Sequence, residues 1–498
     1  MRIGSPAYPG PPHAPCLISS LSRSARAAMS RRIRARMDPA GTTDRILELL
    51  AAYAHAAAHE GLPPRTEHEV RRRVLDSIGV AIAGLDEPAP TAARRYAERL
   101  PGGVSIWGAP ERASLEGAGF ANGVAVRCLD FNDTYLSREP LHPSDTIAPL
   151  LALAEDRGLP ARDLLTAIAI AYELGVRLCD ATSFRAHGFD HVNVIGIATA
   201  AAAGRLLGLD AERIRHGIAL AVVAHVALRE TRAGELSMWK GAAAAHAGRL
   251  GVTTALLAEA GMTGPFRPFE GEMGLVARVL GGEPLDPAPL EGLAALAPPE
   301  RIADTYVKLW PVEYHAQSAV DAALQLHAEL AGAGIASVRI DTFRAAYEII
   351  AKDPEKWDPR TRETADHSIQ YIVCAALQDG EITERTFDLE RIRRPDTLEL
   401  LQRRTTVELD EALTAGYPEG IPNRITVTTA DGRTLVREVT YPRGHARNPM
   451  TDEELVAKYR ANVTGRFSRE RAEAVERAVW ALGEGDVSVE PLLEALRG

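Results

Sequence analysis

Apolar residues recur every three or four positions along most of the chain, and short breaks at Gly and Pro separate the stretches. "DRILELLAAYAHAAA" (44–58), "EVRRRVLDSIGVAIAGL" (69–85) and "ARDLLTAIAIAYELGVRL" (161–178) show this spacing, which is typical of amphipathic helices. The pattern begins at about residue 43 and continues to about residue 297. It predicts a large helical domain.

The pattern changes after residue 300. "SVRIDTF" (337–343) and "TVELDEAL" (406–413) are predicted strands, and "NRITVTTADGRTLVREVTY" (423–441) has two alternating runs around Asp431-Gly432, a strong hairpin signal. Two polar helices, 451–463 and 468–482, are expected near the end. We therefore predict a mostly α fold: a helical domain over residues 41–298 and 441–498, and an inserted α+β lid domain over 299–440, with a cleft between them.

Length and charge narrow the possibilities. The chain has 498 residues, 46% of them hydrophobic, more than the roughly 250 to 300 residues that one core usually serves. The net charge is −10 with no dense Lys/Arg stripe in the body of the chain, which argues against a nucleic-acid partner. Uncharged runs such as "GIALAVVAHVAL" fall short of the roughly 18 apolar residues of a membrane span. We expect a soluble protein, and its scattered cysteines, interpreted as reduced thiols, favour the cytoplasm.

The N-terminal segment has a different composition. Residues 1–37 contain seven arginines and no acidic residue, together with several Pro, Gly and Ser, but they lack the apolar segment of a signal peptide. Some of this composition is shared with transit peptides. A disordered basic tail over residues 1–40, or a start codon placed too early with Met29 or Met37 as the true start, is the preferred interpretation.

Cofactor motifs are not found in the sequence. Cys16, Cys128, Cys179 and Cys374 form no C-x-x-C pair, so neither a disulfide framework nor an iron–sulfur site is indicated. "GAGIAS" (332–337) lacks the third glycine of a dinucleotide loop and precedes a strand instead of following one. His187 and His191 have the spacing of a metal pair, but no third ligand lies near them in the sequence. We expect no cofactor and no metal.

Ionisable residues are concentrated in "LDFNDTYLSREPLHPSDTIAPLLALAE" (129–155). Pro143 should push His142 out of helical geometry, and Ser144 or Asp145 is suited to cap a helix that begins at Thr146. A histidine at a helix N-terminus stands beside free N–H groups that favour a carboxylate, and it can transfer a proton. Asp130 and Thr134 are spaced to share one face of a helical turn. The alternative is a capped, solvated loop with a bystander histidine.

Three further segments carry candidate site residues. His191 stands two residues before Asn193, a plausible N-cap for the apolar helix that follows, although a satisfied core histidine is an alternative. Arg232 and Lys240, beside Trp239, and Lys308, ahead of Pro311, are cations that could bind a polycarboxylate. The alternative for each of them is an ordinary solvated surface cation.

Taken in order, these segments resemble the MmgE/PrpD superfamily. The resemblance extends from about residue 45 to 465 and rests on several short sequence motifs. Each motif is short, but their order along the chain is specific. These are "LDFNDTY…HPSD", "GFDHV", "TRAGELSMWKG", "KLWPVEYHAQS", "RETADHSIQYIVCAALQDG" and "YPRGHARNPMTDEEL". Members of the family include 2-methylcitrate dehydratase, cis-aconitate decarboxylase and iminodisuccinate epimerase.

The resemblance implies a helical domain with an α+β lid, an active site between them, and a homodimer. It also implies a set of active-site residues, with Arg232 as the alternative to Lys240 because "TRAGELSMWKG" differs from the decarboxylase-type motif. The implied residues are Asp130, Thr134, His142, His191, Lys240, Lys308 and Tyr371.

"LSMWKG" and "RETADHS" look most like the 2-methylcitrate dehydratase branch. The expected function is therefore a metal-independent hydro-lyase of propionate catabolism that converts 2-methylcitrate into 2-methyl-cis-aconitate and water. In this hypothesis Asp130 or His142 removes a proton, His191 helps the hydroxyl leave, and Lys240 and Lys308 bind carboxylates. A separation of the two histidines from a shared pocket by more than about 10 Å would contradict it.

Three other functions are compatible with the same residues. A cis-aconitate decarboxylase would use the same cations but protonate carbon after loss of CO2. An epimerase or isomerase of a small dicarboxylate would place two proton-transfer groups on opposite faces of one carbon. A protein of a different class would bind a polycarboxylate without turning it over.

Overall fold

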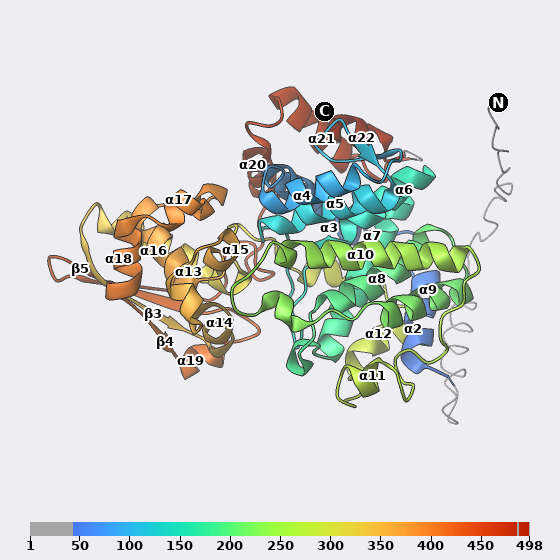
Figure 1. The fold of residues 1–498 in the computed structure, drawn as a ribbon, viewed down its shortest axis with the longest axis horizontal. Helices are drawn as coiled ribbons and strands as arrows, with labels where there is room; N and C mark the ends of the chain where they lie inside the picture. The colour runs from blue at the N-terminus through green and yellow to red at the C-terminus, as the bar shows by residue number, and fades with distance from the viewer. Residues whose placement is uncertain (1–42, 486–487, 498) are drawn as a thin grey trace.

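The computed structural model describes residues 43–485 and 488–497 (Figure 1). The basic tail predicted for residues 1–40 lies outside the described residues, as do Cys16, Met29 and Met37. Helices make up most of the described chain and strands are few, so the predicted mostly α fold class is confirmed. No described helix combines the length and the hydropathy that a membrane crossing would require.

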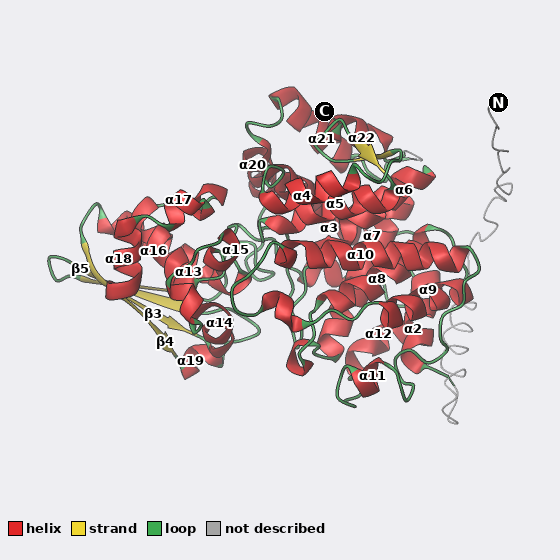
Figure 2. Cartoon of the chain, viewed as in Figure 1, coloured by secondary structure: helices red, strands yellow, loops and turns green. Residues whose placement is uncertain are grey.

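Most of the helices form one large body, which we call the helical domain (Figure 2). The last three helices return to it after the chain has left, and α20 packs against α3. A short antiparallel pair, β1 (Val104–Ser105) and β2 (Arg112–Ala113), lies at its edge. The helices are α2 (Arg45–Ala56), α3 (Pro64–Ala83), α4 (Pro88–Ala97), α5 (Leu115–Cys128), α6 (Ile147–Arg157), α7 (Ala161–Ala181), α8 (Val192–Leu206), α9 (Ala211–Ala224), α10 (Trp239–Glu259), α11 (Leu275–Arg278), α12 (Glu291–Ala294), α20 (Asp452–Val463), α21 (Arg469–Trp480) and α22 (Glu490–Leu496).

Small residues let the central helices of this domain approach closely. α10 packs against α5, α8 and α9. A Cβ at Gly251 of α10 would lie 2.7 Å from the carbonyl oxygen of Gly196 in α8, and a Cβ at Gly123 of α5 would lie 2.9 Å from the Cβ of Ala245. Both distances are shorter than van der Waals contact, so glycine is required there. This packing fixes the C-terminal end of α5 beside the N-terminal end of α10, and both ends carry site residues.

The elements from Gln317 to Val439 form a second body, which we call the smaller domain (Figure 1). Its four strands have the order β4–β3–β5–β6, with β3 parallel to β4 and antiparallel to β5. α13 packs on β5 and β6, and α16 packs on α13. The elements are α13 (Gln317–Leu330), β3 (Ile335–Thr342), α14 (Arg344–Ala346), α15 (Arg362–Ala365), α16 (Ile369–Asp379), α17 (Leu389–Ile392), α18 (Pro395–Arg404), β4 (Thr405–Leu409), α19 (Glu411–Thr414), β5 (Asn423–Thr429) and β6 (Thr434–Val439).

The strands follow the hydrophobic pattern with one exception. The hairpin predicted around Asp431-Gly432 is present as β5 and β6, and every second residue of β5 is buried. Gly432 has φ +88°, a conformation that favours glycine. The strand predicted over residues 406–413 is wrong beyond Leu409. The side chain of Asp410 accepts the N–H of Ala412, 2.8 Å away, and caps α19.

The loop after α5 and the segment 305–316 bring the two bodies together. The backbones of Thr134 and Tyr306 exchange hydrogen bonds of 2.9 and 2.7 Å. The N–H of Val307 donates to the carbonyl of Gly444, 3.1 Å away, on the segment that returns from the smaller domain. The loop of residues 129–146, the site loop below, is therefore held against the connections between the two bodies.

Candidate active site

A cavity lies where the two bodies meet. The helical domain contributes the site loop and the segments that flank α8 and α10, whereas the remaining residues come from the connection and the smaller domain. The lining residues include Arg127, Asp130, Thr134, His142, Arg185, His191, Arg229, Arg232, Lys308, Glu313, His315, Asp353, Lys356 and His367.

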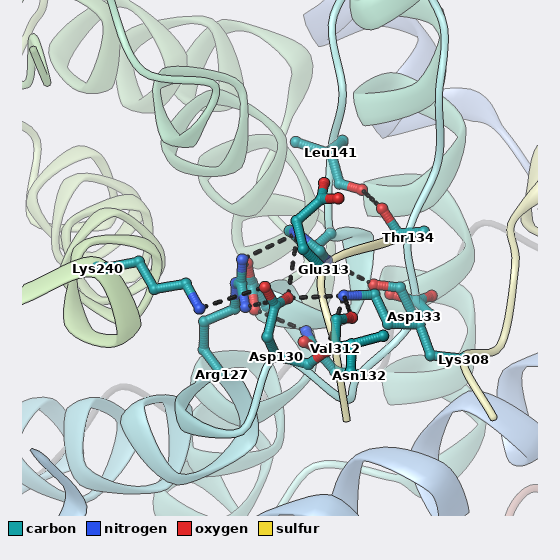
Figure 3. Close-up of polar contacts among 12 residues, drawn as sticks. Arg127, Asp130, Asn132, Asp133, Thr134, Leu141, Lys240, Lys308, Val312 and Glu313 are labelled. Atoms are coloured by element: carbon teal, nitrogen blue, oxygen red, sulfur yellow. Dashed lines mark hydrogen bonds and ion pairs between the residues drawn. The ribbon is translucent and has the colours of Figure 1, made fainter. Parts of the chain in front are cut away.

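Asp130 is the centre of a buried ion cluster in this cavity (Figure 3). Its Oδ1 accepts hydrogen bonds from Nη1 of Arg127 at 2.6 Å and from Nζ of Lys308 at 2.7 Å. Its Oδ2 lies 3.2 Å from Nζ of Lys240 and 3.4 Å from Nε2 of His367. Lys240 and Lys308 reach the carboxylate from opposite sides. Asp130 therefore binds together α5, α10, the connecting segment and the smaller domain.

The electrostatics of Asp130 make it a poor proton acceptor. Burial alone would raise the pKa of its carboxyl, but Arg127, Lys240 and Lys308 hold that pKa well below its usual range. Its backbone has φ +50°, a conformation that Asp and Asn adopt more readily than most other residues. The strained turn directs the carboxylate back towards Arg127 in the last turn of α5. Asp130 is thus a fixed anion that holds the cations in place.

His142 is neutral, and its hydrogen bonds define its tautomer. Nδ1 lies 2.7 Å from the carbonyl oxygen of Asp133, so Nδ1 carries the proton, and Nε2 accepts from Nη2 of Arg127 at 2.9 Å. Burial and the charge of Arg127 lower the pKa of His142 well below its usual value. His142 does precede a helical segment, as predicted, but that segment begins at Pro143. The expected caps are wrong, because α6 begins at Ile147, Thr146 occupies its N-cap, and no side chain forms a capping hydrogen bond there.

His191 is an imidazole without a hydrogen bond, within the described chain, at either ring nitrogen. It is 3% exposed and lines the cavity, and neither ring nitrogen has a hydrogen bond to any described residue. Its Nδ1 lies 3.2 Å from Oδ1 of Asp190, whose carboxylate is also paired with Arg232. Burial and then Arg232 lower the pKa of His191 well below its usual value. The predicted cap is wrong here too, because α8 begins at Val192 and His191 itself occupies the N-cap.

The two histidines lie side by side. Their ring centroids are 5.7 Å apart, well within the separation that the hypothesis required. Thr134 also lines the cavity, and its Oγ1 donates to the carbonyl of Leu141, 3.0 Å away. Asp130 and Thr134 do not share a helical turn, since residues 129–134 are not helical. The loop geometry brings them together instead.

The predicted cations are already occupied by protein groups. Nζ of Lys308 donates to Oδ1 and the carbonyl of Asp130 and to the carbonyl of Val312, at 2.7, 2.7 and 3.2 Å, and an ammonium group has only three donors. Lys240 is fully buried between Asp130 and Asp366 and is not among the residues that line the cavity. Arg232 lines the cavity but is paired with Asp190.

Tyr371 does not lie where the resemblance implied. It is fully buried in α16, its hydroxyl donates to the carbonyl of Thr386 at 2.6 Å, and its ring packs against Phe387. It is not among the cavity-lining residues. The structure therefore gives Tyr371 a place in the core of the smaller domain instead of a contact with a ligand.

Several cavity residues were not among the predicted site residues. Arg127, Arg185, Arg229, Lys356 and His367 all line the cavity. Arg127 lies three residues before Asp130 at a helix end, and this spacing could have indicated an ion pair between them. His367 follows the "RETAD" word directly. The other three lie in short irregular segments whose sequences carry no periodic signal.

Comparison with known proteins gives matches over both bodies. The family profile described as the MmgE/PrpD N-terminal domain matches residues 48–288, and the profile described as the MmgE/PrpD C-terminal domain matches residues 310–483. The 2-methylcitrate dehydratase of Cupriavidus necator is 32% identical over 459 residues, 86% of this chain and 91% of that protein.

Two further relatives have comparable coverage. The 2-methylcitrate dehydratase of Escherichia coli (strain K12) is 30% identical over 434 residues, 79% of this chain and 85% of that protein. The human cis-aconitate decarboxylase is 29% identical over 462 residues, 87% of this chain and 91% of that protein. Relatives named for two different activities thus align over most of this chain.

Replacing Asp130 should destabilise the whole protein. Asp130→Asn keeps the side-chain shape and tolerates the positive φ, but it leaves Arg127, Lys240 and Lys308 without their shared anion. Loss of one partner from a buried ion pair costs about 3 to 5 kcal/mol, and urea unfolding should show a decrease in this range. The control is Asp86→Asn, since Asp86 forms an exposed pair with Arg466 and should lose about 1 kcal/mol or less. Equal effects of the two substitutions would contradict the central role of Asp130.

The buried histidines should make stability fall with acidification. The pKa values of His142, His191 and His367 are all lowered in the folded protein, so the unfolded chain takes up more protons below about pH 6.5. Each such group reduces the free energy of unfolding by about 1.4 kcal/mol per pH unit in that range. His191→Asn should remove the contribution of one histidine to the change in the free energy of unfolding between about pH 6.5 and 5, measured by urea titration at each pH. Lys352→Gln, an exposed substitution, is the control; a wild-type slope in His191→Asn would show that His191 is charged in the folded state.

Proposed function

Because this chain belongs to the MmgE/PrpD family, we propose that it is a lyase that removes water from a tricarboxylate, with 2-methylcitrate as substrate and 2-methyl-cis-aconitate as product. The observation that carries the proposal is a cationic cavity holding two adjacent imidazoles. The 2-methylcitrate dehydratases of Cupriavidus necator and Escherichia coli, which align over most of this chain, support the reaction class.

The charge of the cavity suits a polyanionic substrate. Among the described residues, six cationic side chains and three carboxylates line it. Two of those carboxylates are engaged, since Asp130 binds the cation cluster and Glu313 lies 2.7 Å from Nδ1 of His315. The protein as a whole carries a net charge of −10. A local excess of positive charge in an acidic protein supports the binding of a small anion with several carboxylates.

We assign proton removal to His191, which reverses the role expected from the sequence. Dehydration requires abstraction of a proton from the carbon next to a carboxylate, and neutral histidine suits that task. Asp130 is excluded as the base because three cations lower its pKa. Nε2 of His142 already accepts a hydrogen bond from Arg127. Nδ1 of His191 forms no hydrogen bond with any described residue, but the carboxylate of Asp190 lies 3.2 Å away, and this negative charge favours the tautomer with the proton on Nδ1. The lone pair of Nε2 is then left for the substrate.

The hydroxyl then leaves beside Arg127 and His142. Its oxygen gains negative charge as the bond to carbon breaks, and the guanidinium of Arg127 stabilises that charge. The proton taken from carbon has to end on the departing hydroxide to form water. The two imidazole rings are 5.7 Å apart between centroids, and a hydroxide held between them receives the proton from Nε2 of His191. The carbon keeps the electron pair of the C–H bond, which forms the new double bond.

A second candidate reaction is decarboxylation of cis-aconitate. The human cis-aconitate decarboxylase aligns over 87% of this chain, and the same cations and imidazoles would suit loss of CO2 followed by protonation of carbon. A homodimer and a place in propionate catabolism remain predictions from the family resemblance, and a cytoplasmic location remains a prediction from the sequence.

The proposed substrate can be tested directly. Purified, chelator-treated protein incubated with 2-methylcitrate should produce an unsaturated tricarboxylate, followed by ultraviolet absorbance and identified by mass. Citrate and cis-aconitate are the comparison substrates, with CO2 release measured for the latter. Release of CO2 from cis-aconitate without dehydration of 2-methylcitrate would move the assignment to the decarboxylase. No turnover of any of the three would contradict the proposal.

The roles of the two histidines can be separated by isotope effects. His191→Asn should lower kcat by about 10² to 10⁴ and increase the primary isotope effect with substrate deuterated at the reacting carbon, because proton removal becomes rate-limiting. His142→Asn should also be slow but show a small isotope effect, since departure of the hydroxyl becomes limiting. His68→Asn is the control, because His68 stacks on Trp480 and does not line the cavity. The opposite pattern of isotope effects would exchange the two roles.

A further inference from the structure

The cations of the cavity fall into two groups. Arg127, Lys308 and Arg232 are bound to protein carboxylates or carbonyls, as described above. The side chains of Arg185, Arg229 and Lys356 also line the cavity, yet none of them forms a hydrogen bond or ion pair with any described residue. These three, which we call the open cations, carry positive charge that the protein itself does not compensate at close range.

Lys356 is the most informative of the open cations. It lies in a 3-10 turn, Pro354–Trp357, of the smaller domain and is 3% exposed. The turn is fixed, since the hydroxyl of Ser368 donates to the carbonyl of Lys356 at 2.6 Å. Burial lowers the pKa of its ammonium group. Asp353 lines the same cavity but lies outside ion-pair distance of Lys356. The ammonium group therefore faces the cavity with no anion of the described residues within ion-pair distance, and an anionic ligand supplies the charge that the protein does not.

The backbone holds Arg185 and Arg229 close to each other on the helical domain. Arg185 begins a 3-10 turn, Arg185–His187, and Arg229 begins another, Arg229–Arg232. The two segments pair through a bridge between Phe189 and Leu228, and the N–H of Arg229 donates to the carbonyl of Gly188 at 3.0 Å. Burial and then repulsion from Arg185 lower the pKa of Arg229. Like charges fixed in proximity favour an anion between them.

We propose that Arg185, Arg229 and Lys356 bind the carboxylates of the substrate, in place of the lysines at positions 240 and 308. This inference rests on the proposed function for the identity of the anion. Three open cations match three carboxylates, so a dicarboxylate would leave one open cation unpaired. The arginines belong to the helical domain and Lys356 to the smaller domain, and a tricarboxylate therefore spans the two. The open cations select ligands by their number of carboxylates. The imidazoles of His142 and His191 act on the reacting carbon and on the hydroxyl of the bound substrate.

Binding of unreactive acids tests this inference separately from turnover. Propane-1,2,3-tricarboxylate has no hydroxyl to lose, and glutarate lacks its middle carboxylate. Calorimetry on the full chain should show tighter binding of the tricarboxylate by the wild type. Lys356→Met should weaken that binding by about 30-fold or more, as expected when one partner of a buried charge contact is removed, and should narrow the preference over glutarate. Lys356→Arg should retain most of the affinity.

Lys352→Met is the matched control, because Lys352 is an exposed lysine four residues earlier on the same segment. It should bind both acids as the wild type does. Without ligand, Lys356→Met should unfold at the same temperature as the wild type or a higher one, since it removes an unpaired buried charge. A lower unfolding temperature would show that Lys356 is structural and would overturn the inference. Wild-type affinity in Lys356→Met, or no binding of the tricarboxylate to the wild type, would do the same.

The two proposals fail in different ways. If 2-methylcitrate is not dehydrated but propane-1,2,3-tricarboxylate still binds through Lys356, the proposed function is wrong and the open cations stand as a tricarboxylate site. If 2-methylcitrate is dehydrated and Lys356→Met leaves kcat and KM unchanged, the function stands and this assignment of its carboxylate contacts is wrong.

Discussion

The buried carboxylate of Asp130 is the interaction on which the rest of the site depends. Arg127, Lys240 and Lys308 come from segments far apart in the sequence, and each places a positive charge on this one anion. Buried ions are tolerated only when each has its partner, so these segments have to assemble together. His367 adds the smaller domain, 3.4 Å from the same carboxylate. Formation of the cavity and association of the two bodies are therefore linked through one side chain.

A second buried polar network holds the site loop against α3, α7 and α20. Asp133 accepts the hydroxyl of Tyr172 at 2.7 Å and lies 3.4 Å from Arg73. Lys458 of α20 pairs with Asp76 of α3 at 2.6 Å and donates to the carbonyl of Phe131 at 3.0 Å. The returning C-terminal helices thus hold the loop on which His142 is placed. Since proton transfer tolerates little displacement, this polar support explains why charges are buried where apolar packing would cost less.

Local patterns predicted much of this structure, and partner geometry accounts for most of what they missed. The periodicity of apolar residues identifies the helices and the hairpin. Asp130 and His142 could be predicted as site residues because they lie in a short loop, rich in ionisable residues, before a helix. Tyr371 was misplaced because a helical period shows that a face is buried but not whether it meets a cavity or a core. Arg229 and Lys356 were missed because their importance lies in having no protein partner. That property arises only when distant segments are placed together, so no window of sequence contains it.

The same reasoning explains why recognisable sequence motifs do not show which cations are free to bind a ligand. Lys240 and Lys308 lie in sequence motifs that resemble those of the family, and both form ion pairs with Asp130. Their positive charge therefore stabilises the assembled site. A cation already neutralised by a buried carboxylate attracts a second anion weakly, whereas one without a partner recovers its desolvation cost only when a ligand arrives. The free enzyme is thus less stable than a fully paired cavity would make it. This instability favours the bound state, and it gives the cavity a preference for ligands with enough carboxylates to satisfy every open cation.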